Sequence, residues 1–168
     1  MNRALPVVQL RVPTDEDAVA WHRIFAHPDV MEFHGGRAAE LSVYEELTAR
    51  QRRHDAERGY CLWTVLDENE RVVGFTGAQP WEREWGPKDE IEIGWRLGRE
   101  HWGKGYVSAA AQLTLDRVRA AGVPGVVAMV DARNGRSIAV TRRLGMRLAE
   151  VFATPDARQK GHCYRLDL

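Results

Sequence analysis

Apolar and polar positions alternate or recur along the chain in patterns that predict a mixed α/β fold. Short β-rich runs separated by polar turns predict strands, and apolar residues at a spacing of three to four predict helices. The expected strands are 7–12, 60–66, 71–79, 90–97, 126–130, 147–154 and 162–168. The expected helices are 15–26, a short turn or helix from 27–30, 43–57, one beginning after Gly105, and 137–144. This order predicts a single domain over residues 1–168, with one mixed sheet and helices on both faces.

Capping residues support several of these helix boundaries. Thr14 and Asp17 have the spacing of a capping box at the start of the first helix. Ser42 is expected to cap the long helix that follows the Gly35–Gly36 break, and Asn134 is a good N-cap for the last helix. Gly122 and the proline two residues later would end the helix that follows Gly105.

Composition and charge exclude several classes of function. The 168 residues carry 24 Lys plus Arg and 24 Asp plus Glu, so no overall charge attracts nucleic acid or an anionic membrane. The N-terminus lacks the apolar core of a signal peptide, and no run reaches transmembrane length, so we expect a cytoplasmic protein. Cys61 and Cys163 stand far apart, which favours two buried thiols over a disulfide. The six histidines show no metal-ligand spacing, and we expect no metal.

The stretch REHWGKGYVSAA (99–110) is the first candidate for chemistry, because it joins a predicted strand to a predicted helix through two glycines. Such a turn directs backbone N–H groups and the positive helix end at one point, where anions bind. A Walker loop is excluded, because glycine follows Lys104 where Ser or Thr is needed. A dinucleotide fingerprint is weak, because Ser108 stands where its third glycine belongs. The pyrophosphate of coenzyme A, or a turn with no ligand, remains open from these residues alone.

Four pieces of the chain, EIEIGWRL, HWGKGY, NGRS and RRLGM, together resemble the GNAT superfamily of acyl-CoA N-acyltransferases, and most of all its RimJ/RimL-like branch. The opening LRVPTDEDAVAW…HPDVMEF is similar to that branch too, so the resemblance covers nearly the whole chain. It implies the GNAT fold, a mostly antiparallel central sheet in which strands 90–97 and 126–130 run parallel and splay apart. It also implies transfer of an acetyl group from acetyl-CoA directly to a primary amine, on a protein N-terminus or a small molecule.

The resemblance also assigns residues to roles. It implies that the backbone near Trp95, Arg96 and Leu97 binds the pantetheine arm with Asn134, that Ser137 lies near the thioester sulfur, and that Glu92 is the general base. The residues implied for the pyrophosphate are Trp102, Gly103, Lys104, Gly105, Tyr106, Val107 and Ser108. The implied partners are acetyl-CoA and an amine acceptor, and a homodimer is compatible with the resemblance. We expect neither nucleic acid nor a membrane as a partner. A module that binds acyl-CoA or a nucleotide as a sensor, without turnover, is the alternative.

The chain departs from the family pattern at several of these positions. Glu100 stands where Gln or Arg is usual, and Thr141 replaces a tyrosine that often serves as the acid. Ser137 and Thr141 lie four apart on one predicted helix, so both are expected to point at the sulfur and to stabilise the thiolate by hydrogen bonds. Trp81 and Trp85 are expected at an acceptor-recognition loop, with one of the two in the core, and His34–Gly36 is expected to face the acceptor.

Overall fold

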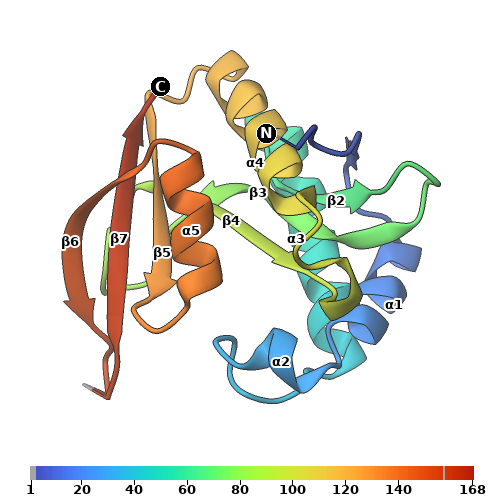
Figure 1. Cartoon of the computed structure of the whole chain (residues 1–168), viewed down its shortest axis with the longest axis horizontal. Helices are drawn as coiled ribbons and strands as arrows, with labels where there is room; N and C mark the ends of the chain where they lie inside the picture. Colours follow the sequence, from blue (N-terminus) through green and yellow to red (C-terminus); the bar gives the residue numbers. More distant parts are fainter. Residues whose placement is uncertain (1–2, 157) are drawn as a thin grey trace.

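A computed structural model describes residues 3–156 and 158–168 (Figure 1). Within these residues, seven strands form one sheet in the order β1-β2-β3-β4-β5-β7-β6. The strands are β1 (Gln9–Arg11), β2 (Leu62–Leu66), β3 (Val72–Pro80), β4 (Ile91–Leu97), β5 (Gly125–Asp131), β6 (Arg147–Ala153) and β7 (Lys160–Asp167). The helices are α1 (Asp15–Ile24), α2 (Pro28–Met31), α3 (Leu41–Arg58), α4 (Tyr106–Ala120) and α5 (Gly135–Arg143), with a 3₁₀ turn at Arg99–His101. All seven predicted strands are present, with ends that differ by up to two residues.

The middle of the sheet contains the predicted parallel pair. β4 pairs with β3 along its whole length, from Ile91 to Leu97. Toward β5, by contrast, the register holds only Glu92 opposite Val127, and beyond this point the two strands diverge (Figure 1). The other strand pairs are antiparallel. The splayed pair is therefore confirmed, and it leaves one edge of β4 without a strand partner inside the sheet.

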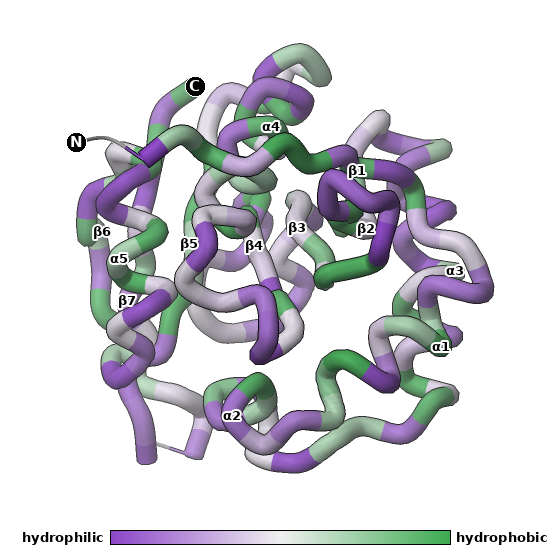
Figure 2. The backbone as a smooth tube through the Cα atoms, turned by 45° about the vertical axis from the view of Figure 1, so that its right-hand side comes forward, coloured by the Kyte–Doolittle hydropathy of each residue, from purple (hydrophilic) through white to green (hydrophobic). Residues whose placement is uncertain are grey.

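The N-terminal segment crosses the start of α4 before it enters β1 (Figure 2). A side-chain atom added at Gly105, just before α4, would lie 3.1 Å from Pro6 and 3.4 Å from Leu5. Leu5 and Pro6 thus lie beside the helix end that the glycine-rich turn leads into.

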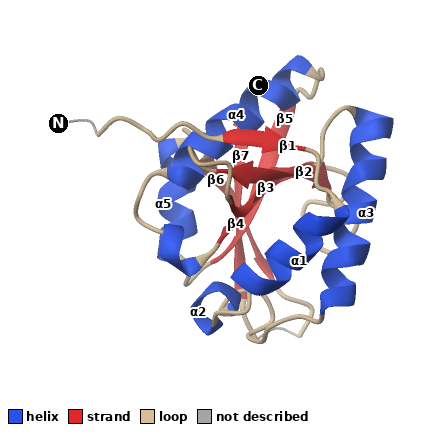
Figure 3. Cartoon of the chain, turned by 90° about the vertical axis from the view of Figure 1, so that its right-hand side faces the viewer, coloured by secondary structure: helices blue, strands red, loops and turns tan. Residues whose placement is uncertain are grey.

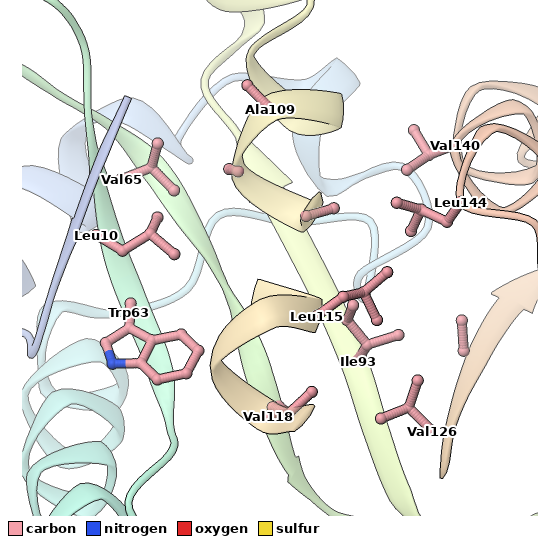
Figure 4. Packing of buried hydrophobic residues seen from close by; sticks show 14 of the residues in the cluster. Leu10, Trp63, Val65, Ile93, Ala109, Leu115, Val118, Val126, Val140 and Leu144 are labelled. Atoms are coloured by element: carbon pink, nitrogen blue, oxygen red, sulfur yellow. The ribbon is translucent and has the colours of Figure 1, made fainter. Parts of the chain in front are cut away.

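Helices cover both faces of the sheet, α4 and α5 on one side and α1 and α3 on the other (Figure 3). On the α4 face, Leu115 points toward Ile93 of β4 within a continuous apolar core (Figure 4). On the other face, Trp21 and Phe25 of α1 pack on Phe75 of β3, with ring centroids 5.2 and 5.6 Å from that phenyl ring. Full burial of a large apolar side chain stabilises the fold by about 1.5–3 kcal/mol. These two cores hold β4 in place.

Two predicted helix starts have different outcomes. The capping box is confirmed, because Thr14 Oγ1 accepts from the Asp17 N–H at 3.3 Å and Asp17 Oδ2 accepts from the Thr14 N–H at 3.0 Å. The Ser42 cap is wrong: α3 begins at Leu41, and its N-cap residue Glu40 makes no side-chain capping bond. Packing of the buried helix face, which carries Tyr44, fixes this start instead of a capping side chain.

The two cysteines are free and buried, as expected. Burial raises the pKa of the Cys61 thiol to about 12, so this thiol is a poor nucleophile at neutral pH. Across residues 3–156 and 158–168, no group of three or more His, Cys, Asp or Glu side chains is placed to hold a metal ion. No helix in the same ranges has the length and hydropathy needed to cross a bilayer.

Candidate active site

A cavity of about 550 Å³ opens where β4 and β5 diverge. Its walls come from the end of β4, the glycine-rich turn, the first turn of α4, one face of α5, the α2 region and Leu5. The predicted residues that line it are Trp95, Arg96, Leu97, Trp102, Gly103, Gly105, Tyr106, Val107, Ser108, Asn134 and Ser137. The structure therefore brings together in one cavity residues from three separate stretches of sequence.

The glycine-rich turn presents backbone N–H groups at one end of this cavity. Gly103 and Gly105 have φ angles of +73° and +86°, which L side chains rarely adopt, and a Cβ at Gly103 would meet no atom within 4 Å. Gly105 is the N-cap of α4 and has no capping side chain, so the first N–H groups of the helix stay available. Together with the positive helix end, they form a site for an anion.

Lys104 lies outside the lining of this cavity, although it sits between the two glycines. It is exposed and borders a neighbouring surface hollow, beside Arg3 and Glu100. The left-handed backbone on either side of Lys104 turns its side chain away from the helix end. The Lys104 side chain is therefore not placed to contact a ligand in the main cavity.

Two arginines of α5 contribute the charge that Lys104 does not, and neither was predicted. Arg136 stacks over the Trp102 ring at 4.0 Å from its centroid, and Arg143 Nη1 donates to Ser108 Oγ at 3.4 Å. Both line the cavity near the start of α4. Their spacing of seven residues, or two helical turns, on the helix capped by Asn134 was the available sequence signal.

The start of α5 holds the predicted N-x-x-S pair. Asn134 Oδ1 accepts from the Ser137 N–H at 3.2 Å, which confirms Asn134 as the helix cap. Ser137 Oγ in turn accepts from Trp95 Nε1 at 3.2 Å, so this pair bridges α5 and β4 across the splay. Because Ser137 Oγ is the acceptor in that bond, its own proton remains free to donate into the cavity.

Thr141 does not point at the same place as Ser137, and that expectation was wrong. Its side chain is fully buried, and its hydroxyl donates to the Ile138 carbonyl at 2.6 Å. At 3.6 residues per turn, four residues advance a helix by about 40° beyond a full turn. That rotation carries Thr141 from the cavity wall into the core around Val140.

Glu92 lies on β4 at the last paired position before the strands part, outside the cavity lining. Gln79 Nε2 donates to Glu92 Oε1 at 3.2 Å, and Gln51 Nε2 donates to Gln79 Oε1 at 3.0 Å. Burial is the main cause of a raised pKa for Glu92. The nearby Glu90 accepts from Arg165 at 2.7 Å and is neutralised by that ion pair. Glu92 is thus a positioned carboxylate of increased basicity.

The α2 region and the residues after it form a further wall of the cavity. Val30, Phe33 and His34 line it, and Arg133 stacks over the Phe33 ring at 5.4 Å. Burial, followed by the charge of Arg96, lowers the pKa of His34 to about 3. This lowered pKa keeps the imidazole of His34, which is partly exposed to solvent, neutral at pH 7.

Trp81 and Trp85 pack on each other instead of lining the cavity. Their rings meet edge-on with centroids 5.2 Å apart, and Trp81 Nε1 donates to the Trp85 carbonyl. Trp81 is buried, so the prediction that one of the two belongs to the core is confirmed.

The sequence model of the acetyltransferase (GNAT) domain matches residues 8–147. The chain belongs to the GNAT acetyltransferase family. The match falls within its RimJ/RimL-like branch, as the sequence resemblance implied, and makes the protein a GNAT N-acetyltransferase. The matched range includes the glycine-rich turn, Glu92 and the whole of α5, so every cavity residue except Leu5 is part of the family domain.

This GNAT chain is similar to individual proteins in sequence or in fold. It is 31% identical over 152 residues to the uncharacterized protein YkkB of Bacillus subtilis, covering 86% of this chain and 84% of YkkB. It is 28% identical over 106 residues to an L-methionine sulfoximine/L-methionine sulfone acetyltransferase of Pseudomonas aeruginosa, covering 62% of each chain. Its fold matches yncA of Salmonella typhimurium, solved with its cofactor acetyl-CoA, at a TM-score of 0.74 and 20% identity, over 96% of this chain and 94% of that one.

Proposed function

We propose that the protein is an acetyl-CoA-dependent N-acetyltransferase that transfers acetyl directly to a primary amine, on a protein N-terminus or on a small molecule. The observation that carries the proposal is the cavity at the β4–β5 splay, which has an anion site at the glycine-rich turn and is lined by β4 from Trp95, three residues after Glu92. Acetyl-CoA binding is typical of GNAT enzymes, and the yncA structure contains it. The acetyltransferase of Pseudomonas aeruginosa supports a small amine as one kind of acceptor.

The cavity residues fit coenzyme A in their chemistry and in their order along the cavity wall. The N–H groups that follow Gly103 and Gly105, with Arg136 and Arg143, would hold the pyrophosphate. The unpaired edge of β4 at Trp95–Leu97 and the Asn134 side chain would hold the pantetheine amides. When bound, acetyl-CoA supplies an activated acetyl thioester. The Leu97 carbonyl already accepts from Trp102 Nε1 at 3.1 Å, a bond that ties the end of β4 to the turn.

Glu92 is our candidate for the group that removes the proton from the amine. Its raised pKa makes it a stronger base than an exposed carboxylate, and Gln79 fixes the direction of one oxygen. Because Glu92 does not line the cavity, we propose that a water molecule relays the proton. An N-terminal amine has a pKa near 8 and needs less help than a lysine near 10.4.

Ser137 is our candidate for the group that stabilises the leaving thiolate. Trp95 Nε1 occupies a lone pair of its oxygen, so its hydroxyl proton is free to donate toward the sulfur. A neutral hydroxyl supplies a hydrogen bond but is too weak an acid to transfer the proton fully. Its contribution is therefore electrostatic support of the thiolate.

Thiol release from acetyl-CoA, measured over a panel of N-terminal peptides and small amines, tests this proposal. We expect release that depends on at least one amine and yields the corresponding acetamide in equal amount. Tight binding of acetyl-CoA without turnover on any amine would contradict the enzyme and support a sensor module.

A further inference from the structure

Arg96 is a charged side chain that the proposed chemistry leaves unused. It lies on β4, four residues beyond Glu92, and its guanidinium stacks against two rings, 5.3 Å from the centroids of Phe25 and Phe75. These rings belong to the core between α1 and the sheet, so the Arg96 side chain lies on the face opposite α4. The same side chain borders the cavity.

No acidic side chain within the described residues neutralises Arg96. The ion pairs formed by arginines there involve Arg11, Arg52, Arg58, Arg71, Arg99, Arg119, Arg133 and Arg165. Asp29, the one carboxylate in the cavity lining, pairs with Arg99 at 3.3 Å. Arg96 Nε is buried without a hydrogen-bond partner. The neighbouring Tyr44 hydroxyl is also buried and also makes no hydrogen bond of normal geometry.

A buried guanidinium without a counter-charge is unfavourable, because arginine stays protonated in proteins and loses its hydration on burial. The arrangement becomes favourable when an anion enters from the cavity, where the low dielectric strengthens the attraction. The planar guanidinium donates two parallel bonds to a carboxylate, which gives the contact a defined orientation. Neutral His34, beside Arg96 in the cavity wall, adds no competing charge.

The phosphates of coenzyme A have their own positive groups elsewhere. The N-terminus of α4, Arg136 and Arg143 lie beside the glycine-rich turn, on the α4 face of the sheet, where Arg136 stacks on Trp102 and Arg143 donates to Ser108. Arg96 lies on the opposite face and borders the same cavity as Val30 of α2 and Phe33, which follows that helix. An anion held by Arg96 would therefore approach from the side opposite the proposed pyrophosphate site.

We propose that Arg96 binds a carboxylate of the acceptor, so that the preferred substrate is an amine that also carries an acidic group. This inference rests on the proposed function and narrows its acceptor. The carboxylate could belong to a free amino acid or to an acidic side chain of a peptide, since both present the same planar anion. Glu92 and Arg96 are four residues apart on one strand, so both long side chains leave the same face of β4.

The test uses matched acceptors that differ only in charge. One arm compares the L-amino acids with their amides, and a second compares N-terminal peptides that carry Asp or Asn at the second position. We expect kcat/KM for the acid of at least one pair to exceed that for its amide by about 10- to 100-fold, the usual range for a hydrogen-bonded charge. The arm that shows the preference identifies the source of the carboxylate.

Arg96→Met tests the residue, because methionine can fill the space between the two rings without a charge. We expect the preference for the acid to vanish in this variant, mainly through the acceptor KM, and to return in part in Arg96→Lys. Arg117→Met is the matched control, since Arg117 also stacks on an aromatic ring, 4.9 Å from Trp63, away from the cavity. It should keep the wild-type preference.

Several outcomes would overturn this proposal. Equal rates for acids and amides in the wild type, or an unchanged preference in folded Arg96→Met, would each do so. If no amine is turned over, the proposed function fails. Calorimetry with the same matched pairs, on the protein saturated with coenzyme A, then tests separately whether Arg96 binds a carboxylate. Tighter binding of the acids, lost in Arg96→Met, would then support the carboxylate site, and equal or absent binding would reject it.

Discussion

Replacement of Gly103 by valine separates the cost of backbone strain from the loss of the coenzyme site. The structure offers a matched control in Gly122, at the other end of α4. Its φ of +84° is close to the +73° of Gly103, and an added Cβ would meet no atom within 4 Å at either position. A non-glycine residue in this conformation costs about 1–2 kcal/mol. For a chain of this size, both variants should lose roughly 2–8 °C in melting temperature.

Only Gly103→Val should lose affinity for coenzyme A, because Gly103 lines the cavity and Gly122 does not. Each lost hydrogen bond between a backbone N–H and a charged phosphate oxygen should weaken binding by roughly 10- to 150-fold. Isothermal titration calorimetry with coenzyme A, on samples shown to be folded by circular dichroism, measures the difference. Equal dissociation constants for folded Gly103→Val and Gly122→Val would refute the placement of the pyrophosphate at this turn.

Four further predictions concern Glu92 and helix α5. Glu92→Gln should lower turnover by about 10²–10⁴-fold with little change in acetyl-CoA binding, and a loss of only a few-fold would leave positioning as the main source of catalysis. The raised pKa of Glu92 means that folding favours its protonated form, so the stabilisation it provides below about pH 4 is lost as the pH rises through the folded-state pKa. Glu92→Gln should thus melt above the wild type at pH 8 but not at pH 4, and an equal difference at both pH values would contradict that shift. Asn134→Ala should cost about 1 kcal/mol in chemical denaturation, because it removes the α5 cap, and an unchanged stability would mean that packing alone positions the helix. Ser137→Ala should lower turnover per folded molecule whereas Thr141→Val should only lower stability, since the Thr141 hydroxyl is bonded inside its helix, and a clear kcat loss in Thr141→Val would restore it to the site.

Much of the fold could be predicted because local signals and tertiary packing agree. The Thr14–Asp17 capping box confirms this for α1, where the buried Asp17 also pairs with Arg11 at 2.6 Å. The start of α3 could not be predicted in the same way. Ser42 has the better capping side chain, yet the burial of Tyr44 against His22 of α1 sets the helix start two residues earlier than a Ser42 cap allows.

Some residues of the candidate site could likewise be predicted from the sequence, and others could not. The glycines, Asn134 and Ser137 could be found because backbone geometry and motif spacing mark them in the sequence. The position of the Arg96 side chain, the stacking of Arg136 on Trp102 and the burial of Thr141 were not predicted, because they depend on the rotation of a strand or helix about its own axis. A shift of about 40° decides whether a residue of α5 faces the cavity or the core. Such angles come from packing between distant elements, which no local pattern encodes.

Initial-rate kinetics with acetyl-CoA and an accepted amine both varied test most directly whether the acetyl group passes straight from one to the other. The cavity lining includes no cysteine among the described residues, and the Cys61 thiol is buried with a raised pKa. We therefore predict double-reciprocal lines that intersect, and an intact mass of the protein that acetyl-CoA alone leaves unchanged. Parallel lines, together with stoichiometric acetylation of the protein in the absence of amine, would contradict direct transfer in this cavity.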